Sequence, residues 1–272
     1  MYLTHLLRKK YRRKDSIPLN AHRPIWLVHT SMYRGAADDN EHSDRGYFAK
    51  GYYGVVVFAQ TMQIRWHGHS CFEITDSISV VTDPHDGRSL GIAPPSASAD
   101  VVLISHDHFD HNSFKTIRGS HKDVFAFVGE FEYNGSRFLG LETDHDEAGG
   151  SKRGKNVMYT MTLDDISICH CGDLGNIPRD DVIERIAGID ILMVPVGGVY
   201  TMDLPNLIKF IEKVGPRVII PMHYRVGGLS IPVNGVDPFI DSVEYEVEHV
   251  GNEIDLSADE LPTETTIWVF SR

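Results

Sequence analysis

Three histidines and two aspartates lie within six consecutive residues, from His106 to His111, in the stretch ISHDHFDHNSF. Imidazole nitrogens and carboxylate oxygens are ligands that zinc, iron and manganese accept in proteins. The stretch follows DVVLIS, a continuous apolar run typical of a strand that is covered on both faces. The histidines therefore belong to a loop at the end of a buried strand, where functional sites are commonly built. A solvated polar loop is the alternative, and it explains a single histidine better than this cluster.

Single histidines or aspartates follow three other strand-like runs. His145 lies in ETDHDEAGG before a glycine pair, Asp173 follows ISICHCG, and His223 follows VIIPM. Each is weak alone, because a histidine after a strand is more often structural and an aspartate before Leu-Gly often forms a turn. Together with the first cluster, they repeat one pattern at four separated places. The repetition predicts that these segments supply matching ligands to one metal site.

Other residues are weaker candidates for the site. His69 in GHS could contact a substrate or simply pack at a strand end. Asp83 in TDP is expected to brace the neighbouring loop by hydrogen bonds rather than to bind metal. Tyr200 and Thr201 follow a glycine pair, which lets backbone approach a ligand closely, and are candidate substrate contacts. Arg153 could pair with an anionic substrate group, although a surface arginine is the commoner outcome.

The elements that must position these residues are short strands followed by strands alternating with helices. The runs MQIRWHG, SCFEIT, SISVVTDP, DVVLIS, VFAFVG, VMYTMT and ISICHCGD predict strands. Two helices are predicted later, one between Pro178 and Gly188 and one between a capping Asp203 and a terminating Gly215. DILMVPV, RVIIPM and TTIWVF then predict further strands. This order predicts an α+β fold in which two sheets pack together with helices outside.

Charge divides the chain of 272 residues into two parts. Residues 1–61 hold 10 Lys and Arg against 5 Asp and Glu, so residues 62–272 hold the other 16 against 33, a balance of −17 within the total of −12. We predict an N-terminal extension over residues 1–61, basic then polar and poorly ordered, in which YGVVVFAQ could add a strand. Residues 62–272 would form the functional domain. Its acidity argues against nucleic acid as a partner, since phosphate contacts need a basic surface.

The cysteines and the apolar segments indicate a cytoplasmic protein without a membrane span. The chain has three cysteines, too few for a disulfide framework, and no run of about 18 apolar residues or secretory signal. Cys169 and Cys171 flank His170, which invites a second zinc site. A buried strand explains these cysteines better, because no further thiolate partners are present.

Taken jointly, SHDHFDH, His145, GDLG and MHY resemble the metallo-β-lactamase-fold hydrolases over about residues 62–270. Within that superfamily, WHGHSCFEI, VTDP, RGKN, GDLGN, VPVGGVYTMD and IPMHY look similar to a branch of metal-dependent hydrolases related to L-ascorbate-6-phosphate lactonase. The resemblance implies an αββα sandwich of two mixed β-sheets flanked by helices. It also implies a dinuclear metal site at one sheet edge.

The same resemblance implies a role for each ligand. His106, His108 and His145 would hold one metal, Asp110, His111 and His223 the other, and Asp173 would bridge the two. The ions would be two divalent transition metals, with zinc the leading candidate and manganese or iron the alternatives. The implied reaction is cleavage of a small ester, lactone or phosphodiester by a metal-bound hydroxide, with Asp110 and Asp173 as catalytic residues.

Two other functions remain compatible with the sequence. The expected partners follow from the hydrolase function. A flavodiiron-like redox protein or a non-catalytic metal-binding protein could share the fold. The expected partner is a small-molecule substrate, with neither nucleic acid nor membrane, and a homo-oligomer remains an option.

Overall fold

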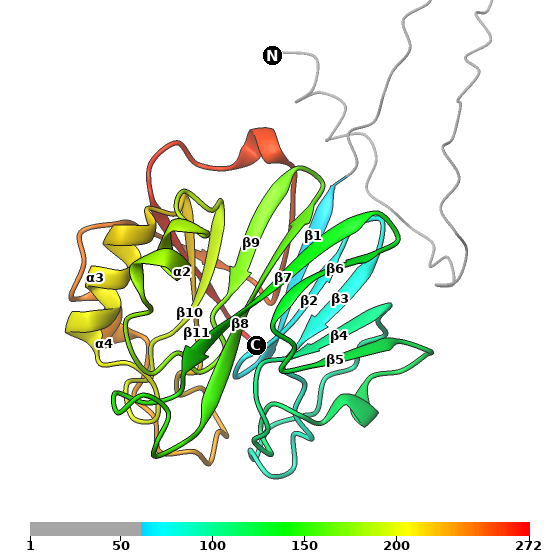
Figure 1. Ribbon diagram of the computed structural model, residues 1–272, viewed down its shortest axis with the longest axis horizontal. Helices are drawn as coiled ribbons and strands as arrows, with labels where there is room; N and C mark the ends of the chain where they lie inside the picture. Colours follow the sequence, from blue (N-terminus) through cyan, green and yellow to red (C-terminus); the bar gives the residue numbers. More distant parts are fainter. Residues whose placement is uncertain (1–60) are drawn as a thin grey trace, which may run out of the picture. The chain divides into compact units, whose positions relative to one another are not determined.

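The computed structural model describes residues 61–272, which form two sheets of six and eight strands (Figure 1). The extension predicted over residues 1–61 lies outside the described residues except for Thr61, as does the strand suggested for YGVVVFAQ. The predicted fold class, two mixed sheets flanked by helices, is confirmed.

The smaller sheet has the order β13-β1-β2-β3-β4-β5. Its strands are β1 (Met62–Gly68), β2 (Cys71–Thr75), β3 (Ser79–Thr82), β4 (Val101–Ile104), β5 (Lys122–Phe125) and β13 (Glu253–Leu256). The pairs from β13 to β3 are antiparallel, and β3, β4 and β5 are parallel. All four residues of β4 are buried, as the apolar run DVVLIS predicts for a strand covered on both faces.

The larger sheet has the order β12-β14-β11-β10-β9-β8-β7-β6. An antiparallel meander comes first in the chain, formed by β6 (Gly129–Tyr133), β7 (Ser136–Asp144), β8 (Lys155–Leu163) and β9 (Ile166–His170). The parallel strands β10 (Ile191–Pro195), β11 (Val218–Met222), β14 (Thr266–Phe270) and β12 (Glu246–Val250) continue the sheet. This half is the alternation of strands and helices that the sequence predicts.

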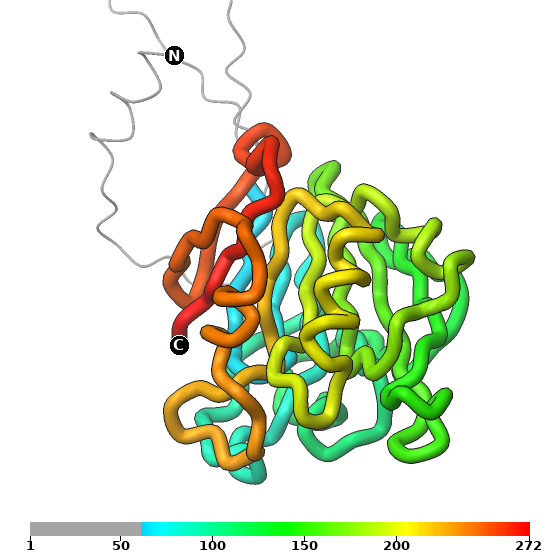
Figure 2. The backbone as a smooth tube through the Cα atoms, turned by 90° about the vertical axis from the view of Figure 1, so that its left-hand side faces the viewer, coloured from blue at the N-terminus to red at the C-terminus, as the bar shows by residue number. Residues whose placement is uncertain are grey.

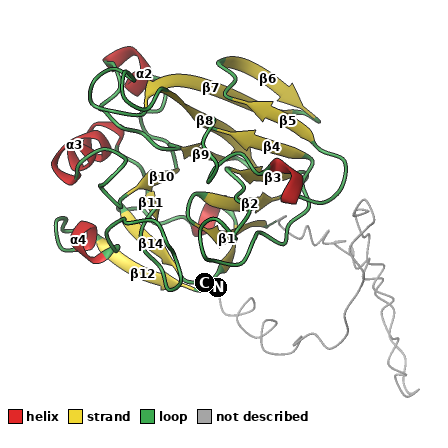
Figure 3. Ribbon diagram, turned by 90° about the horizontal axis from the view of Figure 1, so that it is seen from below, coloured by secondary structure: helices red, strands yellow, loops and turns green. Residues whose placement is uncertain are grey.

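Helices α2 (Asp180–Glu184), α3 (Leu204–Val214) and α4 (Asp237–Ile240) lie along the outer side of the larger sheet (Figure 3). Figure 2, viewed from that side, shows α3 in front of the strands. The Asp203 side chain accepts a hydrogen bond from Asn206 N at the start of α3, and Gly215 ends it with φ of +63°. Both predicted ends of this helix are therefore confirmed.

The earlier helix is shorter than its flanking Pro178 and Gly188 suggest. After α2 the backbone N–H groups of Arg185 and Ile186 bond to carbonyls three residues back, which is the pattern of a tight turn. Gly188 N then donates to the Val214 carbonyl over 2.7 Å. The segment thus ends as a turn fastened to the end of α3.

The main hydrophobic core lies between the two sheets. Trp66 and Phe72 of the smaller sheet meet side chains such as Tyr159 and Phe270 of the larger one. The rings of Phe72 and Phe270 pack edge to face with centroids 6.0 Å apart. A small second cluster covers the outer face of the smaller sheet, where Phe114 of the 3-10 helix η1 (Phe114–Thr116) packs against it.

Candidate metal centre

The predicted site residues follow strands that end at a common edge of the two packed sheets. Because β7 and β9 are both antiparallel to β8, their carboxyl ends lie at the same edge as those of parallel β10 and β11. The segments there are the turn after β1 with His69, Asp83 after β3, residues 105–111 after β4, His145 after β7, Asp173 after β9, residues 196–201 after β10 and His223 after β11.

Three imidazoles converge to form the first cluster. His108 Nδ1 lies 3.0 Å from His106 Nε2 and 3.2 Å from His145 Nε2. Nitrogens bound 2.0–2.1 Å from a tetrahedral zinc would lie about 3.4 Å apart. The three nitrogens therefore stand close to the spacing that one ion requires.

The second cluster contains a residue that the sequence assigned to another role. His69, Asp110, His111 and His223 each offer a ligand atom within 4.8 Å of the others. His69 Nε2 lies 3.0 Å from Asp110 Oδ2, and His111 Nε2 lies 3.5 Å from the same oxygen. Because His69 stands among the expected ligands of the second ion, it can act as a ligand or a close neighbour of that ion as well as a substrate contact.

Asp173 lies between the two clusters. Its Oδ2 is 3.8 Å from His106 Nε2 and 3.4 Å from His145 Nε2, both in the first cluster. The same oxygen is 3.3 Å from the Nε2 atoms of His111 and His223 in the second. One carboxylate oxygen in contact with imidazoles of both clusters is the arrangement that a bridging ligand needs.

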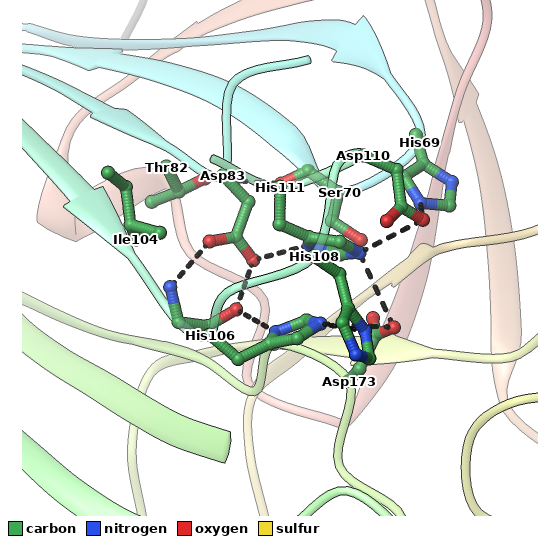
Figure 4. Close-up of polar contacts among 12 residues, drawn as sticks. His69, Ser70, Thr82, Asp83, Ile104, His106, His108, Asp110, His111 and Asp173 are labelled. Carbon is green, nitrogen blue, oxygen red and sulfur yellow. Dashed lines mark hydrogen bonds and ion pairs between the residues drawn. The ribbon is translucent and has the colours of Figure 1, made fainter. Parts of the chain in front are cut away.

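Asp83 braces the loop after β4, as the sequence predicted. Its Oδ1 accepts from Ser105 N over 2.7 Å, and its Oδ2 accepts from Ser105 Oγ over 2.7 Å and pairs with His111 Nδ1 at 3.0 Å (Figure 4). His111 thus lies between Asp83 on one side and Asp110 and Asp173 on the other. A carboxylate that holds one ring nitrogen leaves the other free to bind an ion.

Asn156 holds the backbone of Asp173, a role that sequence reasoning missed. Its Oδ1 accepts from Asp173 N over 3.0 Å, and its Nδ2 donates to Thr143 Oγ1 and the Cys171 carbonyl, each over 2.9 Å. The side chain is fully buried, so these contacts fix it. A Cβ at Gly172 would lie 2.3 Å from Asn156 Oδ1, which explains the glycine. The only signal in the sequence was the position of Asn156 in RGKN.

His170 and its flanking cysteines are structural, as the alternative interpretation holds. Cys169 and Cys171 are buried. Among residues 61–272, neither cysteine belongs to a group of three or more His, Cys, Asp or Glu side chains that are close enough to hold one ion. His170 Nε2 hydrogen-bonds to the Ser70 carbonyl at 2.9 Å, while its Nδ1 accepts from Gly172 N. His170 therefore ties the end of β9 to the turn that carries His69.

The backbone is strained at three positions of this edge. His69, Asp83 and His223 have φ values of 54°, 39° and 54°, in the left-handed region that non-glycine residues seldom adopt. Such conformations persist where the surrounding structure enforces them, and they cluster at functional sites. At all three positions the strained backbone turns sharply where a strand ends.

Electrostatics favour the ligand form of most of these groups. Burial lowers the pKa of His69 and of His106 to about 3, so both imidazoles are neutral at neutral pH. Burial alone would raise the pKa of Asp173, but the neighbouring His111 and His223 hold it well below its usual range. Burial alone would lower the pKa of His111, but Asp173, Asp110 and Asp83 raise it well above its usual value, so this imidazole must release a proton to bind an ion. Neutral imidazole and ionised carboxylate are the forms that bind metal.

Buried atoms without partners show that the site suits a cation. His111 Nε2 and Asp173 Oδ1 are buried, with no hydrogen-bond partner among the described residues. Buried polar atoms without partners are costly in a folded protein, and an ion that displaces the proton of His111 would satisfy both. The donor set of imidazoles and carboxylates therefore fits two divalent transition-metal ions.

Tyr200 and Thr201 lie in the loop after β10 and belong to neither cluster of ligand atoms. Gly197 in this loop packs so closely that a Cβ would lie 2.2 Å from the His223 carbonyl oxygen. Tyr200 stacks against Arg153, with 5.6 Å from the guanidinium carbon to the ring centroid. The structure thus brings Tyr200 together with Arg153, and both of their loops join segments that carry expected ligands.

Comparison with known proteins identifies the family. The model of the beta-lactamase superfamily domain matches residues 63–223. The chain belongs to the beta-lactamase superfamily. The matched segment includes both clusters and Asp173, so the site described above is part of the superfamily domain.

Related superfamily members are named as metal-dependent hydrolases. One, from Thermoplasma acidophilum, is 27% identical over 189 residues, which are 61% of this chain and 84% of the relative. A crystal structure of a candidate Zn-dependent hydrolase of the metallo-beta-lactamase superfamily from Thermotoga maritima has 33% sequence identity and a TM-score of 0.64. That match covers 77% of this chain and all of the other. The relation to L-ascorbate-6-phosphate lactonase stays a prediction.

A more distant neighbour shares the fold alone. The isothiocyanate hydrolase from Delia radicum gut bacteria has a TM-score of 0.54 and 13% identity, covering 66% of this chain and 91% of the other. The fold supports different reactions on one scaffold, so substrate identity must come from the site itself. Within residues 61–272, no helix is long and apolar enough to cross a membrane.

Proposed function

We propose that this superfamily member is a hydrolase that uses two divalent metal ions, zinc first among them, to cleave a small ester, lactone or phosphodiester. The observation that carries the proposal is Asp173, whose one oxygen contacts imidazoles of two separate clusters. Two ions bound there would lower the pKa of a water molecule and polarise the bond under attack.

The residues of the chain would divide the work as follows. His106, His108 and His145 would hold the first ion, Asp110, His111 and His223 the second, and Asp173 both. Although burial alone would raise the pKa of Asp110, the nearby charge of His111 and the hydrogen bond to His69 lower it. Asp110 is therefore ionised, and His69 fixes the orientation of its Oδ2. A carboxylate held in this way can bind a cation and accept a hydrogen bond from the attacking nucleophile.

Hydrolysis is favoured over a redox or purely structural role of the metals. No predicted ligand is missing from the two clusters, and the related proteins carry hydrolase names. The acidic balance of residues 62–272 disfavours nucleic acid as the substrate and fits a small molecule. We propose, from its three unpaired cysteines, that the enzyme works in the cytoplasm.

Metal content and two substitutions test the proposal. The purified protein, loaded with Zn, Mn or Fe, should contain about two metal equivalents by elemental analysis and hydrolyse a chromogenic phosphodiester or lactone. Asp173→Ala should lose both ions and activity, whereas His108→Ala should lose one ion and activity, with circular dichroism unchanged in both. Protein without transition metal after every loading, or full activity in both variants, would refute the proposal.

A further inference from the structure

Arg153 lies in the loop that carries one of the expected ligands. It follows His145 between β7 and β8, and its backbone N–H donates to Asp146 Oδ2 over 2.8 Å. The carbonyl of the next residue, Gly154, accepts from His145 N over 3.1 Å. The Asp146 carboxylate accepts three further backbone N–H groups of this loop. The position of Arg153 relative to His145 is therefore fixed by the backbone.

The loop that carries Tyr200 is fastened to two other ligand-bearing segments. Gly197 packs against the His223 carbonyl, and a Cβ there would lie 2.2 Å from the oxygen. Met202 N donates over 2.9 Å to the carbonyl of the residue after Asp173. Tyr200 and Arg153 therefore meet where the segments of His145, Asp173 and His223 come together.

The side chain of Arg153 is stacked and lacks a carboxylate partner. Its guanidinium carbon lies 5.6 Å from the centroid of the Tyr200 ring, a cation–π contact that holds the planar group in place. Within residues 61–272, no carboxylate forms an ion pair with it, although residues 62–272 hold 33 acidic side chains. A guanidinium held by its face keeps the N–H groups along its edge free for a planar anion.

Thr201 adds an independent observation at the same place. Its hydroxyl is buried and has no hydrogen-bond partner among the described residues. A buried hydroxyl without a partner is unfavourable, so a ligand with acceptor oxygens would satisfy it. Thr201 follows Tyr200 directly in the chain, so its backbone adjoins the residue over whose ring the guanidinium lies.

We propose, building on the hydrolase function above, that Arg153 stacked on Tyr200 and the Thr201 hydroxyl bind an anionic group of the substrate. The group is a carboxylate or a phosphate that is separate from the bond to be cleaved. The substrate is then a small anionic ester, lactone or phosphodiester. The charge of Arg153 offsets the repulsion that the acidic body would exert on such a molecule.

Anion binding tests this inference without relying on hydrolysis. Inorganic phosphate and acetate are titrated by calorimetry into the metal-loaded wild type, Arg153→Gln and Arg137→Gln. Arg137 is the second residue of β7, whereas His145 follows the last residue of that strand, so the two lie roughly 25 Å apart. Substitution of Arg137 therefore removes the same charge far from the site. Arg153→Gln should raise the Kd of at least one anion about tenfold or more, and Arg137→Gln should raise neither.

The pattern of loss identifies the group. Weaker phosphate binding alone assigns a phosphate, weaker acetate binding alone assigns a carboxylate, and loss of both assigns a site for either anion. A wild type that binds neither anion, or an Arg153→Gln variant that binds both as tightly as the wild type, would overturn the inference.

Paired esters connect the subsite to catalysis. 4-Nitrophenyl hexanoate and mono-4-nitrophenyl adipate share the scissile bond and chain length, and only the adipate carries a terminal carboxylate. For a carboxylate site, Arg153→Gln should lower kcat/KM about tenfold on the adipate and leave the hexanoate unchanged. Equal loss on both esters would indicate a structural role and contradict the inference. A wild type that binds anions through Arg153 but cleaves neither ester would contradict the proposed hydrolysis alone.

Discussion

At the scale of single residues, side chains behind the proposed ligands decide how those ligands point. Asp83 places His111 with its Nε2 toward Asp110 and Asp173, because it occupies the Nδ1 side. Asn156 fixes the backbone of Asp173 through one acceptor and two donated hydrogen bonds. Asp83 could be predicted from its place before a proline after an apolar run, whereas the partners of Asn156 come from β7 and from the loop after β9.

Replacement of Asn156 should therefore affect metal binding as well as stability. Asn156→Ala removes three hydrogen bonds and leaves buried partners unpaired, so the free energy of unfolding should fall by about 2–4 kcal/mol. Because Asp173 loses its backbone restraint, metal occupancy in elemental analysis should fall too. Urea denaturation and metal content are measured on the same sample.

A matched control separates these two effects. Tyr159 lies on the same strand, is buried, and bonds through its hydroxyl to Phe127 N and the Ile104 carbonyl. Tyr159→Phe should cost about 1–2 kcal/mol and retain both ions. If Asn156→Ala bound two ions with wild-type affinity, the positioning role of Asn156 would be wrong.

At the scale of elements, α3 shows how local rules specify one helix of the larger sheet. Leu207, Phe210, Ile211 and Val214 follow helical spacing and are all buried. The helix begins after the Asp203 cap and ends at the left-handed Gly215. Local rules of this kind made both ends predictable, whereas the turn after α2 depended on its tertiary bond to the end of α3.

The two ends of α3 should each contribute to stability but not to the metal centre. Asp203→Ala should lower the free energy of unfolding by about 1 kcal/mol, because Asn206 N loses its acceptor. Gly215→Ala should cost about 1–2 kcal/mol, because a Cβ is unfavourable at φ of +63°. Urea denaturation measures both changes, and metal content should equal that of the wild type. If Gly215→Ala left the free energy of unfolding unchanged, the backbone at the end of α3 would have to relax, and the predicted cost would be wrong.

At the scale of the whole domain, the proposed ions would join the two sheets. His69, His106, His108, Asp110 and His111 follow strands of the smaller sheet, and His145, Asp173 and His223 follow strands of the larger one. An ion bound by residues of both sheets binds the folded state and not the separated sheets. Metal should therefore raise the stability of the whole described domain rather than of one loop.

Chelation should lower the melting temperature of this domain. An ion present at a thousandfold excess over its Kd stabilises the fold by about 4 kcal/mol, and a chelator removes that contribution. Scanning calorimetry of the wild type with and without EDTA measures the shift. Asp173→Ala, which is expected to bind no metal, should show the same melting temperature in both conditions. An unchanged wild-type melting temperature would contradict a metal centre shared by the two sheets.

The sequence by itself determined the fold class, most strands, the ends of α3 and the candidate ligands, because these follow from local patterns of apolar, capping and metal-binding residues. Only the tertiary structure decided which strands are neighbours, since strand pairing depends on contacts between residues distant in the chain. It placed His69 beside Asp110 and His223, gave Asn156 its three partners and stacked Arg153 on Tyr200. Each of these contacts joins residues between 13 and 154 positions apart, a separation over which no local pattern in the sequence carries information.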